Sequence, residues 1–440
     1  MDIETAAEID EIDQAILQLT EGDFQSKWDS AKHFLKQFSQ SSDRVVPLLI
    51  HHLQNSSDPE NQWFLVRMLG QFDHPDGIAA IAQTLLSADD DDVRLQATQA
   101  LTMLDASAIK TLSELLNAPH QPLDNRLLAA RALARIRRSA TLEPLLSITA
   151  DPAAPLRAIA IEAVGSFHDP RVTPVLIAAL EDHSDIACDA IRALGRRQDL
   201  LATLDLIGPL QKCLHAPDES VAKESAIALG RLGVDSAAIT LGQRLMQAAP
   251  TTVKIAIVRA LGWMENAIAL DYLIKAFNGS VPVVMPAVKR EIACALGQSR
   301  SAEGKKKAAQ PLLRWLQVAN TQTANAQTTN AQTADETANE SSADPSVNPS
   351  AEPSNSNAAP KTFAIKQAVI SALAMLGRTD ALDSLVPALS DPDPRIRMHA
   401  LSALKQIDPR AAQVKVQSYL DNPHIPVPLR QQAADSLSAW

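Results

Sequence analysis

A motif that recurs about every 32 residues constrains the fold of this chain more than any other feature. In each copy a Leu or Val precedes a position that is usually small, near the end of a helical pattern. The aligned positions are Gly70, Thr102, Ala134, Gly165, Gly195, Gly230, Gly262, Gly297, Ala374 and Lys405. Their successive spacings are 32, 32, 31, 30, 35, 32, 35, 77 and 31 residues. Such a period indicates stacked structural repeats, because one unit cannot bury its apolar face alone.

Each copy contains two amphipathic helices. In residues 151–180, Ile159 and Ala160 belong to the apolar face of a first helix, and Val175 and Leu176 to that of a second. An Asp-Pro pair between the two patterns ends one helix and starts the next. The chain is therefore predicted to be all-α, an α-solenoid of about ten or eleven helical hairpins.

A charged column accompanies the repeat. A cation stands seven residues before the conserved apolar position in seven copies, at Arg94, Arg126, Arg157, Lys254, Lys289, Lys366 and Arg397. Aspartates occur at or just before the start of the same helices, where a carboxylate can cap free N–H groups. We expect these charges to pair between neighbouring repeats as a ladder.

The first helix carries a recognisable pattern, as in "DDDVRLQATQAL" (90–101) and "DPDPRIRMHALSAL" (391–404). This pattern, followed by a Leu-spaced second helix, resembles HEAT repeats over nearly all of residues 24–440. The short period and the Leu-Gly ending are most similar to the HEAT-like subgroup of E/F-type phycobilin lyases. The resemblance implies a solenoid scaffold, or a lyase subunit that handles a bilin on a phycobiliprotein, usually together with a second lyase-like subunit.

The long 77-residue interval marks an insert. Residues 318–361 hold almost no large apolar side chain and are rich in Asn, Thr, Gln, Ala, Ser and Pro, a composition typical of disorder. The predicted organisation is an acidic capping helix (1–22), a repeat array (23–317), a disordered polar insert (318–361), and further repeats with a C-terminal capping helix (362–440).

Charge and composition exclude several function classes. The net charge of −11 disfavours nucleic acid as a partner, because phosphate binding needs a basic face. No apolar run approaches the length of a membrane span, and the N-terminus is acidic rather than signal-like. The three cysteines are too few for a disulfide framework. We therefore expect a cytoplasmic protein that is not embedded in a membrane.

Recognised catalytic and metal-binding motifs are missing from the sequence. It has no HExxH, no zinc-type Cys/His spacing, no P-loop and no nucleophile elbow. It also lacks the His-Glu dipeptides of the HEAT-like deoxyhypusine hydroxylases. No catalytic or metal-binding residue is predicted, and an enzyme is the less favoured reading; if the chain is an enzyme, the resemblance implies a phycobilin lyase.

Aromatic and charged residues supply the candidate binding positions. Only 3% of residues are aromatic, so rings close to arginines are candidates for stacking a bilin and holding its propionates; otherwise they fill gaps between repeats. We expect the second helices to line the concave face, so their exposed residues are candidates for protein contact. The candidates are Trp63, Arg67, Arg259, Trp263, Asp271, Tyr272 and Lys275.

Cys294 is the remaining candidate. Eight of the nine residues aligned with it in other repeats are polar, which predicts a column that faces solvent or a partner. Cys213 aligns with alanines and is predicted to pack internally. Three hypotheses follow. The chain is a protein-binding scaffold without a cofactor, a bilin-handling lyase-like subunit, or an iron–sulfur assembly partner that donates the single thiolate of Cys294.

Overall fold

A computed structural model of the chain describes residues 3–118, 120–279, 285–340 and 359–437, and these ranges contain helices and no strands. They divide into two compact units, residues 1–194 and 195–440, here called unit 1 and unit 2. Unit 1 holds twelve α-helices among its described residues: α1 (Ile3–Thr20), α2 (Phe24–Phe38), α3 (Ser42–Asn55), α4 (Pro59–Leu69), α5 (Pro75–Ser87), α6 (Asp91–Met103), α7 (Ala106–Asn117), α8 (Leu123–Ile136), α9 (Leu142–Ser147), α10 (Ala154–Val164), α11 (Val172–Ala178) and α12 (Ser184–Leu194).

Unit 2 continues the same alternation of longer and shorter helices. Its described helices are α13 (Ile207–Leu214), α14 (Glu219–Leu232), α15 (Asp235–Leu245), α16 (Thr251–Met264), α17 (Ala267–Phe277), α18 (Pro286–Gly297), α19 (Ala302–Glu340), α20 (Ala359–Leu376), α21 (Leu382–Leu385), α22 (Pro394–Ile407), α23 (Pro409–Leu420) and α24 (Val427–Leu437). Short 3₁₀ turns precede or extend α9, α11 and α21. This order of helices confirms the predicted solenoid of helical hairpins.

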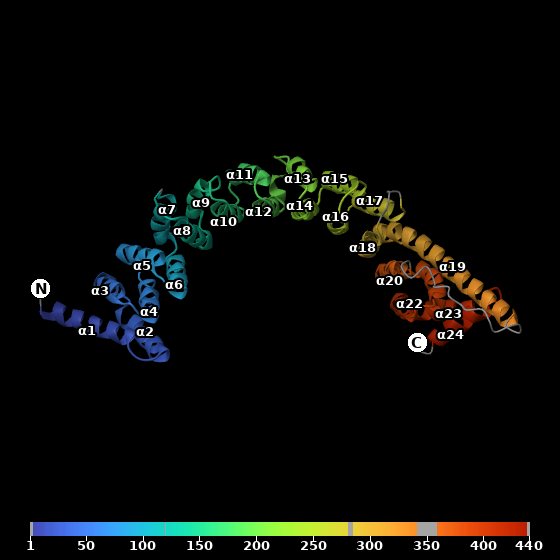
Figure 1. The fold of residues 1–440 in the computed structure, drawn as a ribbon, viewed down its shortest axis with the longest axis horizontal. Coiled ribbons are helices and arrows are strands. Elements are labelled where there is room, and N and C mark those ends of the chain that lie inside the picture. Colours follow the sequence, from blue (N-terminus) through green and yellow to red (C-terminus); the bar gives the residue numbers. More distant parts are fainter. Residues whose placement is uncertain (1–2, 119, 280–284, 341–358, 438–440) are drawn as a thin grey trace. The chain divides into compact units, whose positions relative to one another are not determined.

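Within each unit the helices form two rows. In unit 1 the first helices α4, α6, α8, α10 and α12 pack side by side, and the second helices α3, α5, α7 and α9 form the other row (Figure 1). In unit 2 the rows are α14, α16, α18, α20 and α22, and α13, α15, α17, α19, α21 and α23. Helix α1 packs on α2, α3 and α4 and buries Ile12, Ile16 and Leu19 completely.

Aspartates begin many of the first helices, as the sequence indicated. Asp218 accepts hydrogen bonds from two backbone N–H groups of α14, and Asp393 accepts one in α22. In α6 the capping residue is Asp90, which accepts hydrogen bonds from two backbone N–H groups of that helix. Each such carboxylate satisfies N–H groups that have no partner inside the helix.

The predicted ladder of charges is confirmed in part, since three of its seven cations pair with the next repeat, two in unit 1 and one in unit 2. Arg126 pairs with Asp151 (Nη2–Oδ2 2.5 Å), and both guanidinium edge nitrogens of Arg157 bind Asp182 at 2.6 and 2.7 Å. In unit 2, Lys366 binds Asp391. Each pair joins a first helix to the start of the next first helix, 25 residues on. The column is not uniform, because Arg94 pairs with Asp91 of its own helix and Lys289 lies over aromatic rings of Phe277 and Trp315.

The glycines of the repeat motif set how closely first helices approach one another. A Cβ atom added at Gly230 would lie 2.8 Å from the Cβ of Ala260, and one added at Gly297 would lie 2.7 Å from the Cα of Ala372. Separations below 3.0 Å do not occur between real atoms of this kind, so these positions need glycine. The glycine column is therefore a packing device between neighbouring first helices.

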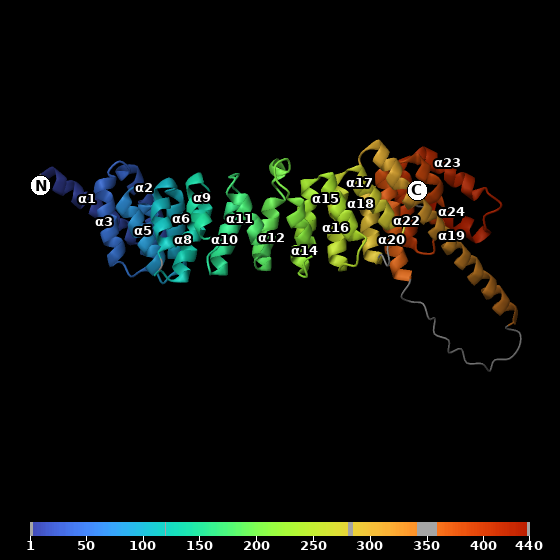
Figure 2. The same ribbon diagram turned by 90° about the horizontal axis from the view of Figure 1, so that it is seen from above.

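The predicted disordered insert is wrong for residues 318–340, which belong to the continuous helix α19. Figures 1 and 2 show α19 as a long helix that runs past α20, and α19 also contacts α21. Amide side chains hold it there: Gln317 donates to Ser384 Oγ (3.1 Å), and Asn320 donates to the carbonyl of Ser384 (3.0 Å). Gln327 donates to the carbonyl of Ser390 (3.3 Å). The disorder prediction was based on the lack of large apolar residues in this segment. Amide hydrogen bonds hold this part of α19 in place without such residues. Residues 341–358 of the predicted insert lie outside the described ranges, and 359–361 belong to α20.

Candidate functional site

A groove of about 1060 Å³ lies across α6, α8 and α10 in unit 1. Its apolar lining includes Leu95, which is 49% exposed, and the half-buried Leu127, Leu128 and Ile159. The groove lies on first helices, whereas the sequence analysis expected second helices to present the contact surface. We call this surface the unit 1 groove.

The glycine column is interrupted at the unit 1 groove. Thr102 in α6 and Ala134 in α8 occupy the position that is Gly230, Gly262 or Gly297 in unit 2, and both line the groove. Their side chains occupy space that glycine leaves free for the neighbouring first helix.

Three arginines give the groove a basic edge. Arg131 and Arg135 project from α8, and Arg137 is the residue that ends this helix; all three line the groove and are exposed. Arg137 adopts a left-handed conformation (φ 53°), which costs a non-glycine residue free energy and turns the chain out of the helix. Within the described ranges none of the three forms an ion pair.

An aromatic cluster lies on the same row, at α2 and α4. The rings of Phe24 and Trp28 stack at a centroid distance of 6.0 Å, and those of Trp28 and Trp63 at 6.3 Å. The guanidinium of Arg67 lies 4.5 Å from the Trp28 ring centroid and 5.5 Å from that of Trp63. Phe24 is 52% exposed. Residues of this kind are enriched at the energetic centres of protein interfaces.

The structure brings together the predicted Trp63 and Arg67, and it adds Phe24 and Trp28, which the sequence analysis missed. The missed pair stands four residues apart in α2, a spacing that places both rings on one face of a helix. That spacing was the available signal, but only the contact between α2 and α4 shows that the four side chains form one cluster.

In unit 2, Arg259 and Cys294 lie on neighbouring first helices. Arg259 Nε binds Glu291 Oε1 at 2.6 Å, so its charge is already neutralised by the protein. Cys294 is half-buried, whereas Cys188 and Cys213 are buried. Burial raises the pKa of the Cys294 thiol above its ordinary value, and the Glu291 carboxylate adds to this effect. The aligned positions in the other repeats are nowhere buried, so the prediction of an accessible column is confirmed.

The remaining candidates do not form a cluster with these two. Trp263 is 53% exposed on α16. The ring of Tyr272 occupies the space beside Gly242, since a Cβ atom there would meet its Cγ at 2.2 Å; this contact fits the gap-filling role. Asp271 and Lys275 are exposed on the second helix α17 and do not line the pocket described next.

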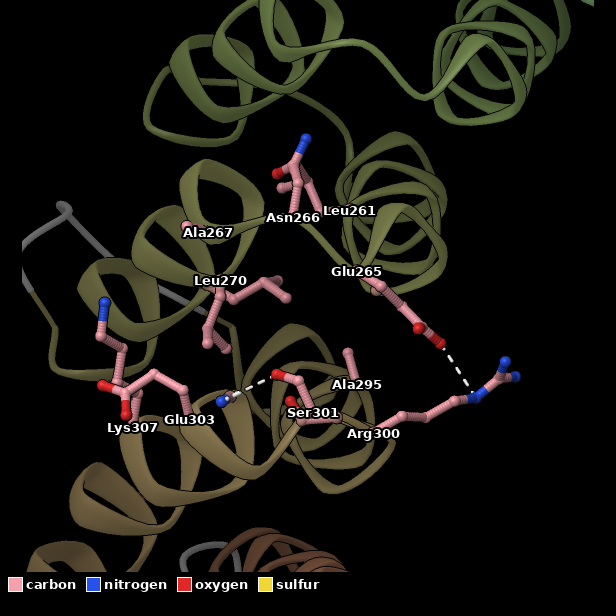
Figure 3. A pocket seen from close by; sticks show the side chains of 14 residues that line it. Leu261, Glu265, Asn266, Ala267, Leu270, Ala295, Arg300, Ser301, Glu303 and Lys307 are labelled. Carbon is pink, nitrogen blue, oxygen red and sulfur yellow. Dashed lines mark hydrogen bonds and ion pairs between the residues drawn. The ribbon is translucent and has the colours of Figure 1, made fainter.

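A smaller pocket of about 240 Å³ in unit 2 lies between the α16–α17 and α18–α19 turns (Figure 3). Its floor includes Leu261, Leu270 and Ala295. Its rim is bonded internally: Glu265 pairs with Arg300 at 2.9 Å, and the backbone N–H of Gly304 donates to Ser301 Oγ at 3.0 Å. The pocket therefore offers apolar surface and few polar groups that lack a partner.

The described residues also limit other chemistry. Within their ranges, no three His, Cys, Asp or Glu side chains are placed to hold one metal ion. None of their helices has the length and apolar content needed to cross a bilayer. The conspicuous surfaces of the described chain are thus the unit 1 groove and the aromatic cluster beside it.

Comparison with known proteins identifies the repeat. The family of HEAT repeats matches residues 46–125, 109–195 and 360–438, just over half of the chain. No curated protein matches significantly. Among solved structures, importin beta is 11% identical with a TM-score of 0.54, over 98% of this chain and 65% of that one. A structure of Kap95p with RanGDP is 13% identical with a TM-score of 0.50, over 98% of this chain and 59% of that one.

A third solved structure, an engineered protein, is 18% identical with a TM-score of 0.31, over 97% of this chain and 98% of the other. The chain spans less than two thirds of the importin beta and Kap95p-complex chains. Their likeness shows an α-solenoid fold. None of these matches points to the phycobilin-lyase subgroup.

Proposed function

Because this chain belongs to the family of HEAT repeats, we propose that it is a protein-binding scaffold whose main contact surface is the unit 1 groove. The observation that carries the proposal is an open groove with exposed leucine and unpaired arginine side chains on one row of helices. Stacked repeats create extended surfaces of this type, and exposed apolar patches on otherwise polar proteins mark interaction sites.

The dimensions of the groove suit a segment of another protein better than a small ligand. First helices packed about 10 Å apart place α6 and α10 roughly 20 Å from each other. Including α4, which carries Arg67, the face extends to about 30 Å. Small-molecule sites are usually enclosed and bury most of their ligand, whereas this surface is open along its length.

Substitution of one groove leucine tests the proposal. Leu95→Asp places a charge on the groove floor, and Val414→Asp on α23 is a matched control because Val414 is also exposed (69%). Affinity capture from native lysate, quantified by mass spectrometry, should yield proteins retained by the wild type and by Val414→Asp but lost from Leu95→Asp. A retained set that is the same for all three proteins would contradict the proposal.

A second candidate function is bilin handling, and the aromatic cluster is the observation that favours it. Trp28 and Trp63 offer planes for a tetrapyrrole, and Arg67 offers a cation for a propionate. Arg259, the other predicted cation, is already bound to Glu291. Mixing the protein with free bilin should shift the absorption spectrum to the red, and Arg67→Gln should weaken the shift. An unchanged spectrum together with no co-elution would remove this candidate.

A further inference from the structure

We propose that the segment bound in the unit 1 groove is acidic and carries leucine or other aliphatic side chains. The inference rests on the proposed function and specifies the partner's chemistry. It follows from which arginines of unit 1 are paired and which are not, from the apolar groove floor, and from the length of the face.

Most arginines of unit 1 are used internally. Arg126 and Arg157 belong to the ladder, Arg138 binds Asp105, and Arg171 binds Glu143 and Asp169. Four arginines make no ion pair or side-chain hydrogen bond with the described part of the chain, and all four lie on the first-helix row between α4 and α8: Arg67, Arg131, Arg135 and Arg137. The arginines of unit 1 that lack an ion pair therefore lie along one row of helices, in a protein with a net charge of −11.

The carboxylates of the groove are fewer and partly occupied. Asp91 is bound by Arg94 at 2.7 Å, which leaves Asp124 and Glu162 as the other acidic lining residues. Three unpaired arginines therefore outnumber two carboxylates. Complementary charge would steer an acidic segment to this face and suppress basic competitors, and guanidinium groups bind carboxylates in a bidentate manner.

The floor of the groove is apolar, so a bound segment should also place aliphatic side chains against it. Leu95, Leu127 and Ile159 come from three successive first helices, so they recur about every 10 Å along the face. An extended chain rises about 3.3 Å per residue, so a segment of roughly six residues crosses from α6 to α10. Three more residues reach α4, where Arg67 contacts the rings of Trp28 and Trp63.

Arg67 differs from the other three because stacking fixes it. Its guanidinium lies 4.5 Å from the Trp28 ring centroid and 5.5 Å from that of Trp63, and these contacts limit its motion. A carboxylate bound by such a guanidinium loses less entropy than one bound by a free side chain. This position is the expected anchor for an acidic residue at one end of the segment.

Selection of peptides by the intact protein tests the inference. A display library of random twelve-residue peptides is selected against the full chain, and the winning peptides are synthesised and measured by fluorescence anisotropy. We expect winners rich in Asp or Glu with aliphatic residues between them. Their affinity should fall at least tenfold for the triple variant Arg131→Gln, Arg135→Gln and Arg137→Gln, and severalfold between 50 and 500 mM salt.

The control removes the same charge from the other row. Lys110, Lys212 and Lys275 are exposed on second helices, and changing all three to Gln should alter the affinity less than twofold. Winners that are neutral or basic, yet lost on Leu95→Asp, would overturn the acidic partner and leave the scaffold function standing. Winners that bind Leu95→Asp as tightly as the wild type would overturn both.

Discussion

The first-helix rows of the two units are built from the same repeat but differ in how closely their helices pack. In unit 2 the motif position is Gly230, Gly262 and Gly297, and the next helix approaches within van der Waals contact of the backbone. In unit 1 Gly70 and Gly165 are equally tight, but Thr102 and Ala134 stand at the same position in the two repeats between them, and a groove of about 1060 Å³ lies there. The groove therefore coincides with the two repeats of unit 1 that lack glycine at this position.

The charges follow the same division. Arg259 in unit 2 is held by Glu291 of the next first helix at 2.6 Å. Arg131 stands at the aligned position in unit 1, lines the groove and forms no ion pair with the described part of the chain. At this aligned position unit 2 neutralises its arginine, whereas unit 1 leaves it available to another molecule.

The largest expected effect on the free energy of unfolding comes from the buried ladder pair of unit 2. The side chains of Lys366 and Asp391 are 5% and 7% exposed. Lys366→Met leaves a buried carboxylate without its cation, which should lower the free energy of unfolding by about 3–5 kcal/mol. Arg94→Met is the control in the open unit, because its pair is on the surface and should cost less than about 1 kcal/mol. Urea unfolding measures both, and equal losses would contradict the distinction.

The Arg157–Asp182 pair of unit 1 should contribute less to the free energy of unfolding, and its contribution should depend on pH. Hydrogen bonds from Arg157 lower the pKa of Asp182 to about 2. Since the folded pKa lies below the unfolded value, the stabilisation is complete above about pH 4 and disappears as the pH falls toward 2. The stabilisation lost over this pH range amounts to roughly 2 kcal/mol. Asp182→Asn should therefore reduce stability at pH 6 but not at pH 2. If Asp182→Asn lowered the free energy of unfolding by the same amount at both pH values, the carboxylate charge would not be the cause.

Adding one methyl group to the closed face should have a smaller effect. Gly297→Ala forces a Cβ atom against the backbone of Ala372. Overpacking costs about 1–3 kcal/mol, offset by about 1 kcal/mol of gained helix propensity, so a net loss of about 1–2 kcal/mol is expected in thermal unfolding. Ala134→Ser adds one atom at the aligned position of the open face and should cost less than about 0.5 kcal/mol. Equal tolerance at both sites would refute the packing account of the groove.

The sequence predicts the hairpins well because their signals are local. Apolar periodicity, Asp caps such as Asp218 and the recurrent small residue identify each helix without knowledge of its neighbours. The ladder pairs were also predictable, because the repeat places cation and carboxylate at a constant separation.

Two features could not be predicted from the sequence, for physical reasons. Helix α19 beyond residue 317 is anchored by amide-to-backbone hydrogen bonds such as that of Asn320, and composition reports apolar burial rather than such bonds. The groove depends on the distance between α6 and α8. The substitution of glycine by Thr102 was visible in the alignment, but its consequence is a property of two packed helices.

The smallest expected effect concerns Cys294, which occupies in unit 2 the column of Arg131. Its reactivity therefore reports how far solvent enters the closed face. We expect a thiol reagent to label Cys294 faster than the buried Cys213 in the folded protein, as measured by mass spectrometry of quenched samples. Burial raises the pKa of Cys294, so the rate should still be rising with pH above 8, because the thiolate is the reacting form.

Neighbouring charges should shift this rate by less than tenfold and in opposite directions. Glu291 raises the pKa of Cys294 and Arg259 lowers it, so Glu291→Gln should accelerate labelling at pH 8 and Arg259→Gln should slow it. Arg259 and Glu291 bind each other, so both variants open the same contact, and a change caused only by loosened packing would accelerate labelling in both. Equal protection of Cys294 and Cys213 in the wild type would contradict the accessible position of Cys294 and would mean that the first-helix face of unit 2 excludes solvent at this residue.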